Sequence, residues 1–275
     1  ELEFNKTRII PENDSLISAD QKSSEDRLKE AFLKEWYETL QIMRVIADRV
    51  SVDGNRPKWI DPGVPKGVQA DQFLHAYYYN RVREYGNHYP YPKFYERNKD
   101  NPEAALTETF AWWKGLQEAP TEEDRTIYEW SPYLRKHLSS EKLLNLSFEQ
   151  FKEVCERIHA MRDHALRVDN QTYGLPKDTP PKEREECIGY LAQYLWKQRS
   201  DGGKTVREVI YHVIYGGLEK DVPLRLWEAT QASSWRIPHL GISSLGEMVG
   251  WALPDKFPPR NGRSSKALKA LGYNV

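Results

Sequence analysis

Apolar side chains recur at steps of four and three residues between Ser24 and Val50, and no other feature constrains the fold as strongly. They are Leu28, Phe32, Trp36, Leu40, Met43, Ile46 and Val50. Such spacing places the whole set on one face of an α-helix of about 27 residues. Ser23 or Ser24 can cap its N-terminus, and the turn-forming residues 51–57 end it. The segment therefore predicts a long amphipathic helix.

Helix signals continue through most of the chain. Asn101 followed by Pro102 is a typical helix start, Ser147 is a typical cap, and the acidic residues 122–124 suit the positive end of a helix dipole. Helices are predicted at 70–85, from 102, from 122, at 148–167, 181–199 and 204–217, and in shorter form at 223–231, 243–252 and 264–271. Only residues 207–217 could form either a helix or a strand, because they are rich in β-branched and aromatic residues. The chain is predicted to be mainly α, a multi-helix assembly with long aromatic-rich loops between 51 and 101.

Changes in composition divide the chain. Residues 1–22 are polar and lack a period, so they are predicted to form a loose N-terminal arm. A break near 96–102, after a proline-rich stretch, separates an N-terminal helical region (23–100) from a C-terminal helical bundle (101–275).

The bulk composition excludes several classes of protein. No run approaches the roughly 18 apolar residues that a membrane span needs, so no membrane contact is predicted. Cys155 and Cys187 are the two cysteines, too few for a disulfide scaffold or a four-cysteine zinc site. A reducing cytoplasm is the expected location. The chain carries 40 basic and 41 acidic residues, so any strongly charged surface must come from local clustering.

Two short motifs suggest ligands and are better explained as structure. Gly203–Lys204–Thr205 resembles the end of a phosphate-binding loop, but Gln198 stands where that loop needs glycine, so a plain helix start is predicted and no ATPase. Cys155, His159 and Asp163 are metal-ligand types on one predicted helix face. At 1.5 Å rise per residue the outer two lie about 12 Å apart, so no metal and no other cofactor is predicted.

Arg207 and His212 support one catalytic alternative. Their spacing, with a polar residue after the arginine, resembles that of HEPN-type ribonucleases. The resemblance implies a metal-independent ribonuclease in which the histidine performs acid–base chemistry and the arginine stabilises charge on the phosphate. Otherwise the sequence predicts no reaction for this chain.

Two further stretches have unusual composition. Nine aromatic residues lie between Phe73 and Tyr95, with Arg81, Arg83 and Lys93 among them. This composition suits either a base-stacking platform or tyrosines that fix a loop onto helices.

Residues 96–129 carry nine acids against four bases, which a nucleic acid would avoid. That region is a solvated surface or, as another alternative for function, a protein-interaction scaffold.

The C-terminal region carries a basic stretch without acids. Its cations are Lys256, Arg260, Arg263, Lys266 and Lys269. The last three are three residues apart and would line one stripe of a helix at 264–271, capped by Ser264 or Ser265. Such a stripe suits phosphate binding or a solvated basic surface.

The residues before this stretch resemble the helix-hairpin-helix of DNA-binding proteins and DNA glycosylases. Leu240–Gly241–Ile242–Ser243–Ser244 matches that family's apolar–Gly–apolar–Gly turn, except that Ser243 replaces the second glycine. The resemblance implies that backbone N–H groups of the turn grip a phosphate. Asn261 stands near the position of the glycosylases' catalytic aspartate, which implies a binder without base-excision chemistry.

A second resemblance concerns the whole polypeptide. The stretches FKEVCERIHAMRDHALRV and LGEMVGWALPDKFPPRNGRSSKALKALGYNV are similar to regions attached to AAA+ restriction and anti-phage proteins of the McrB type. The first residue is Glu1, not Met, which suggests a piece of a longer protein whose other domains are partners.

These features together predict a nucleic-acid-binding module, for duplex DNA, within a nuclease or ATPase defence system. The predicted binding residues are Gly241, Ser243, Ser244, Arg260, Asn261, Arg263, Lys266 and Lys269.

Overall fold

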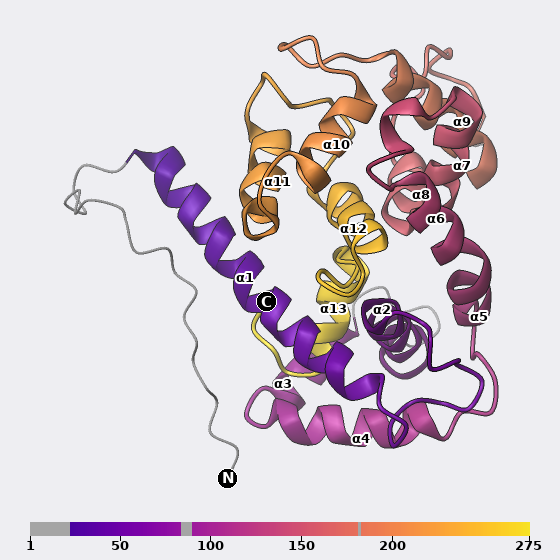
Figure 1. Ribbon diagram of the computed structural model, residues 1–275, viewed down its shortest axis with the longest axis vertical. Coiled ribbons are helices and arrows are strands. Elements are labelled where there is room, and N and C mark those ends of the chain that lie inside the picture. Colours follow the sequence, from indigo (N-terminus) through magenta and orange to yellow (C-terminus); the bar gives the residue numbers. More distant parts are fainter. Residues whose placement is uncertain (1–22, 84–89, 181–182) are drawn as a thin grey trace.

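The computed structural model describes residues 23–83, 90–180 and 183–275, and over these ranges the chain is mainly helical (Figure 1). No strand occurs within them, and only an isolated bridge joins Arg199 and Thr205. The mainly α fold is thus confirmed. The predicted N-terminal arm (1–22) lies outside the described residues.

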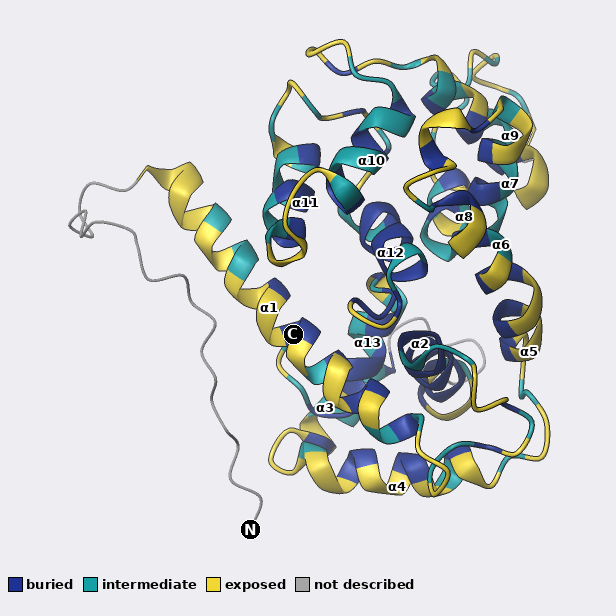
Figure 2. Cartoon of the chain, viewed as in Figure 1, coloured by how far each residue is buried: buried dark blue, intermediate teal, exposed yellow. Residues whose placement is uncertain are grey.

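Helix α1 (Ser24–Val50) follows its apolar period. Ser23 caps it in a capping box with Asp26, and the residues from Trp36 to Val50 on the predicted face are buried. The first turns extend past the body of the molecule and are mostly exposed (Figure 2). Leu28 on the predicted face is therefore 64% exposed.

The remaining N-terminal helices are α2 (Lys66–Tyr77), α3 (Tyr91–Asn98) and α4 (Pro102–Lys114). Helix α2 begins four residues before the predicted start at 70 and continues as a π-helical turn, Tyr78–Val82. Because α2 is surrounded by other helices, Gly67 and every residue after it in the helix are buried. Asn101 caps α4 and Pro102 is its first residue, as predicted.

The middle of the chain forms α5 (Glu123–Arg125), a π-helical turn (Thr126–Trp130), α6 (Ser131–His137), α7 (Phe148–Arg157) and α8 (His159–Ala165). The prediction of one helix over 148–167 was wrong, because Ile158 is extended and separates α7 from α8. Cys155 and His159 therefore belong to different helices.

The C-terminal helices are α9 (Arg184–Lys197), α10 (Val206–Tyr215), α11 (Val222–Gln231), α12 (Ile242–Ala252) and α13 (Gly262–Ala270). The plain helix start predicted for 203–205 is confirmed, since Thr205 caps α10. Helix α12 contacts α2, α6, α8, α10 and α11, while α13 contacts α2 and α3. In Figure 1 both lie in the middle of the molecule.

The proline-containing link between α12 and α13 is held tightly. A methyl group on Gly67 of α2 would lie 1.9 Å from the carbonyl oxygen of Pro254, and one on Gly250 of α12 would lie 2.2 Å from Cα of Pro259. Only glycine allows backbones to approach so closely. The start of α13 is therefore fixed against α2 and α12.

One hydrophobic cluster extends from Trp36 to Leu271 and includes residues on both sides of 96–102. Within the described residues, no helix is long and apolar enough to cross a bilayer.

Candidate functional site

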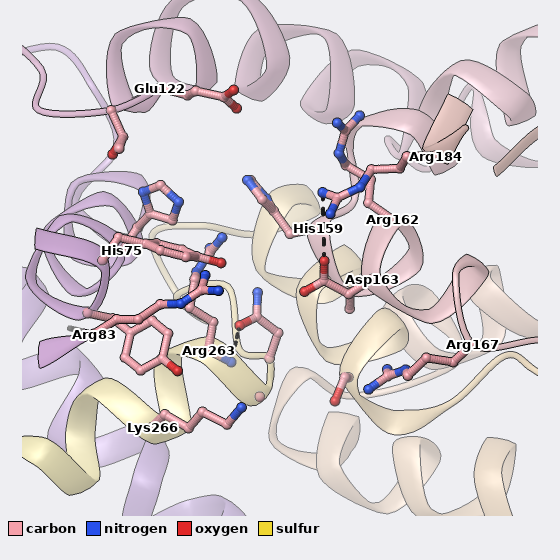
Figure 3. Close-up of a pocket in the computed structure, with 17 residues that line it drawn as sticks. His75, Arg83, Glu122, His159, Arg162, Asp163, Arg167, Arg184, Arg263 and Lys266 are labelled. Atoms are coloured by element: carbon pink, nitrogen blue, oxygen red, sulfur yellow. Dashed lines mark hydrogen bonds and ion pairs between the residues drawn. The ribbon is translucent and has the colours of Figure 1, made fainter. Parts of the chain in front are cut away.

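An open cleft of about 730 Å³ lies where α2, α8, α12 and α13 converge. Figure 3 shows side chains from these elements, and from the starts of α5 and α9, arranged around it. Six of the residues that line it are cations: Arg83, Arg162, Arg167, Arg184, Arg263 and Lys266. Two lining residues, Glu122 and Asp163, are acids. A chain with balanced total charge thus brings six cations to one concave site, and three buried carboxylates beneath it, Asp71, Glu123 and Glu247, offset part of their charge.

A buried carboxylate beneath the cleft organises its floor. Glu247 of α12 is fully buried and accepts hydrogen bonds from the backbone N–H groups of His159 and Ala160, both at 2.9 Å. It also accepts bonds from Asn261 Nδ2 at 3.0 Å and from Trp251 Nε1 at 3.2 Å. Burial alone would raise the pKa of Glu247, but the hydrogen bond and charge of His159, the charge of Arg263 and the N–H of Ala160 together lower it to about 2. The carboxylate is therefore ionised.

The same contacts explain the break between α7 and α8. The first N–H groups of a helix have no partner within it. Glu247 supplies that partner for His159 and Ala160, although it lies 88 residues from His159 in the sequence. A new helix can therefore begin at His159, and its first side chain faces the cleft.

Arg263 and Asp71 form a buried ion pair in the same floor. The guanidinium Nη2 lies 3.2 Å and 3.3 Å from the two carboxylate oxygens, and the two side chains are 8% and 0% exposed. Gln72 donates a further hydrogen bond to Asp71 at 2.6 Å. Arg263 thus links α13 to α2, in addition to lining the cleft.

His75 of α2 is oriented by a second buried carboxylate. Its Nδ1 lies 2.7 Å from Oε1 of Glu123, which is itself fully buried. Thr121 donates two more bonds to that carboxylate, from its backbone N–H and its hydroxyl. Burial opposes the ionisation of Glu123, but the bonds from His75 and Thr121 outweigh it and lower the pKa of the carboxyl.

The buried environment keeps the His75 ring neutral. Burial and the nearby charge of Arg263 lower the pKa of His75 to about 4, against the opposing effect of Glu123. Because Glu123 is an acceptor, Nδ1 of His75 carries the proton and Nε2 has the free lone pair.

The two histidines of the cleft are neighbours. The ring centroids of His75 and His159 are 5.6 Å apart. The Nδ1 atom of His159 lies 3.3 Å from Glu247 Oε1, so both rings face a buried carboxylate through Nδ1. Tyr79 lies 4.7 Å from the His75 ring, and Trp130 lies 5.3 Å from the His159 ring. Because Nδ1 of each ring faces a carboxylate, Nε2 is the nitrogen left for the cleft, which both rings line (Figure 3).

The cations of the cleft wall are held more loosely than its floor. Arg83 lies over the Tyr79 ring at 5.4 Å. Arg184 is 3.9 Å from Asp163, and both side chains are largely exposed. Arg167 is also exposed. Exposed arginines with distant or aromatic partners remain able to bind an anion.

The predicted binding residues divide between two places. Ser243, Asn261, Arg263 and Lys266 line the cleft. Gly241 and Ser244 line an adjacent pocket of about 460 Å³ that shares Ser243. Arg260 and Lys269 line neither of these two cavities.

The predicted cap of the last helix was wrong. Asn261, rather than Ser264 or Ser265, caps α13, through bonds from the N–H groups of Arg263 and Ser264. Arg260, another predicted binding residue, donates to Glu35 at 2.9 Å and lies over the Trp36 ring at 4.4 Å.

The two residues of the ribonuclease alternative have other partners. Arg207 donates to the carbonyl oxygens of Leu144 and Leu146, both at 2.9 Å, and lies over the Trp196 ring. His212 stacks on Trp235 with ring centroids 3.7 Å apart. Its Nε2 lies 3.1 Å from Glu228. Both side chains therefore make structural contacts.

The sequence analysis did not predict that His75 and His159 form a pair, or that the arginines of the cleft wall line a site. The sequence indicated His159 as a possible metal ligand or a hydrogen-bonded histidine, and Arg83 as one of three cations within the aromatic stretch. Within the described residues, no group of three or more potential metal ligands occurs. The aromatic stretch was a usable signal, since Tyr78 and Tyr79 do line the cleft.

Comparison with protein-family models, with curated proteins and with solved structures finds no match to this chain.

Proposed function

We propose that the chain is a nucleic-acid-binding module and that a strand backbone enters the basic cleft. The observation that carries this proposal is the concentration of six cations against two acids in one concave site. Phosphates are the anions that nucleic acids present at regular spacing, and arginine binds them with two parallel hydrogen bonds. Because the cations come from several elements around the opening, they can contact more than one phosphate.

Aromatic rings beside the cations support a nucleic acid over a simple anion. Tyr79 lies beside His75 and under Arg83, and it lines the cleft. An accessible ring next to phosphate-binding cations is the arrangement that holds a base while its backbone is neutralised.

Duplex DNA is the form of nucleic acid that the C-terminal resemblance implies. In this proposal α11, the connection 232–241 and α12 form the helix-hairpin-helix-like element. The start of α12 borders the cleft through Ser243, so its N–H groups and α13 would contact the same backbone. A place in a restriction or anti-phage protein of the McrB type remains part of the proposal.

The test compares two variants with the same change in charge. The first replaces Arg83, Arg167 and Arg184 of the cleft wall by Gln. The matched control replaces Lys114, Lys142 and Lys220, which are exposed and do not line the cleft. If the three arginines each contact a phosphate, the slope of log affinity against log salt for a DNA duplex falls in magnitude by about 2–3 in the first variant only.

Two results would count against the proposal. Equal weakening in both variants would mean that binding follows net charge alone. Absence of binding to duplex DNA, single-stranded DNA and RNA by the unmodified chain would favour the scaffold alternative, in which the acidic region 96–129 contacts a protein.

A further inference from the structure

We propose that the cleft also cleaves the RNA backbone, with His75 and His159 as a general acid–base pair. This inference rests on the proposed function, because it needs a strand phosphate in the cleft. The substrate class is RNA rather than DNA, since the reaction uses the 2′-hydroxyl as its nucleophile.

The geometry of the two rings carries the proposal. Acid–base catalysis at a phosphodiester needs one group to remove a proton from the nucleophile and another to protonate the leaving oxygen. His75 and His159 come from different helices, and their ring centroids are 5.6 Å apart in one cleft. A second imidazole pair, His164 and His239, is as close at 5.3 Å, but there Nε2 of His164 contacts Nδ1 of His239 instead of being left for a ligand.

Each ring has its orientation fixed by a buried acceptor. Glu123 and Glu247 are both 0% exposed, and each contacts Nδ1 of its histidine. A carboxylate at Nδ1 selects the tautomer and directs Nε2 away from it, as in other acid–base sites. Glu123 and Glu247 are therefore positioning residues, and the two Nε2 atoms are the reactive ones.

The environment of His75 indicates which ring acts as the base. His75 faces Glu123, Tyr79, His159 and Arg263, and in this setting its pKa is lowered to about 4. It is neutral near pH 7 and can accept a proton at Nε2. His159, the other ring of the pair, is assigned the transfer of a proton to the leaving oxygen. Arg263 and Lys266 line the same cleft and can stabilise negative charge that develops on the phosphate.

The reaction balances without a further reactant. His75 takes the proton of the 2′-hydroxyl, the 2′-oxygen forms a bond to phosphorus, and the bond from phosphorus to the 5′-oxygen breaks. His159 donates a proton to the departing 5′-oxygen. The products are a 2′,3′-cyclic phosphate and a 5′-hydroxyl. Proton exchange with water restores both rings, and no electron is transferred.

The experiment uses the full chain, a single-stranded RNA with a labelled end, and EDTA in every reaction. The unmodified chain is expected to produce 2′,3′-cyclic phosphate ends, identified by mass. His75→Gln and His159→Gln are each expected to lower the cleavage rate about 100-fold to 10,000-fold, while RNA binding and the thermal melt are retained. His212→Gln is the matched control, because His212 also contacts a carboxylate but lies outside the cleft.

Two modified substrates test the roles, the first with the unmodified chain and the second by rescue of a variant. An RNA with a single 2′-deoxy nucleotide at the cleaved position should bind and resist the unmodified chain. An RNA with a bridging 5′-sulfur has a leaving group that needs no proton. It should restore cleavage by His159→Gln and leave His75→Gln inactive.

The outcomes separate this inference from the proposed function. Binding of RNA without cleavage by the unmodified chain overturns the inference and leaves the binding proposal intact. Absence of RNA binding overturns the inference alone, and absence of binding to RNA and to both forms of DNA overturns the binding proposal as well. Cleavage that survives both cleft variants but is lost in His212→Gln would instead support the catalytic alternative based on Arg207 and His212.

Discussion

The molecule contains histidine–carboxylate contacts in two regions, and they differ in which nitrogen is used. In the basic cleft, His75 and His159 contact buried carboxylates through Nδ1. In the region of α10 and α11, His212 contacts Glu228 through Nε2, and the Glu228 side chain is 36% exposed. In the cleft, Nε2 of each histidine is left facing the opening. In His212, Nε2 is the nitrogen that contacts the carboxylate.

The surroundings of the rings extend this difference. The His212 ring is stacked on Trp235 at an interplanar angle of 8°, and a methyl group on Gly216 would lie 2.7 Å from its Nδ1. The stacked Trp235 ring covers one face of the His212 ring, and Glu228 occupies its Nε2. A histidine beside a carboxylate can act on a ligand only where its second ring nitrogen faces a cleft.

The largest expected effect on stability comes from the cleft floor. Arg263→Met removes the partner of buried Asp71 and should lower the free energy of unfolding by about 3–5 kcal/mol, because the carboxyl, whose pKa burial already raises, must then either stay charged without a partner or bind a proton. Urea denaturation measures the change. Lys269→Met, on the same helix, is the control and should change stability by less than about 0.5 kcal/mol. A loss for Arg263→Met as small as that of the control would mean that the ion pair is not part of a rigid floor.

A smaller loss is expected when the carboxylate beneath His159 is neutralised. Glu247→Gln keeps the shape of the side chain but places an amide against several donors, including the N–H groups of His159 and Ala160. Leaving buried donors unsatisfied should cost about 2–4 kcal/mol in the free energy of unfolding. Glu228→Gln makes the same chemical change at the His212 contact and should cost under about 1 kcal/mol. Similar losses in the two variants would contradict the contrast between the regions.

Acid should destabilise the cleft before the rest of the structure. The pKa of His75 is lowered from 6.5 to about 4 on folding, so the unfolded chain binds a proton more readily in this range. Its contribution to stability is present above pH 6.5 and is lost as the pH falls toward 4. Between pH 7 and pH 5 the loss should be roughly 1–2 kcal/mol. Chemical denaturation at the two pH values checks this, and His75→Gln should lose less than the unmodified chain over the same interval.

Glu247 affects stability at a lower pH than His75, so the contributions of the two groups can be measured separately. Its pKa falls from 4.5 to about 2 on folding, so the stability it contributes is present above pH 4.5 and is lost below that value. A stability curve that is flat between pH 7 and pH 5 would contradict the buried, neutral state of His75.

Local sequence signals predicted the helices well where the structure depends on local contacts. Ser23, Asn101 and Ser147 cap the helices that they were expected to cap. Capping depends on residues three positions away, and the apolar period of α1 depends on steps of three and four, so both are visible in the sequence.

The site was less predictable because its contacts are remote in sequence. Glu247 interrupts the predicted helix 148–167 from 88 residues away, and Arg263 pairs with Asp71 across 192 residues. No local sequence pattern predicts either contact. The basic stretch near the C-terminus was a real signal for Lys266 and Arg263, which line the cleft, yet it did not indicate that Arg263 is buried and paired.

The smallest expected effect concerns the stacked histidine outside the cleft. His212→Ala removes the ring that lies 3.7 Å from Trp235 and should lower the free energy of unfolding by about 0.5–1.5 kcal/mol, the range typical of an aromatic pair. Because neither His212 nor Trp235 lines the cleft, the salt dependence of nucleic-acid binding should not change. Denaturation and a binding titration on one preparation measure both quantities. A changed salt slope at unchanged stability would mean that the α10–α11 region contacts the nucleic acid, so the contrast between a functional and a structural histidine site would no longer hold.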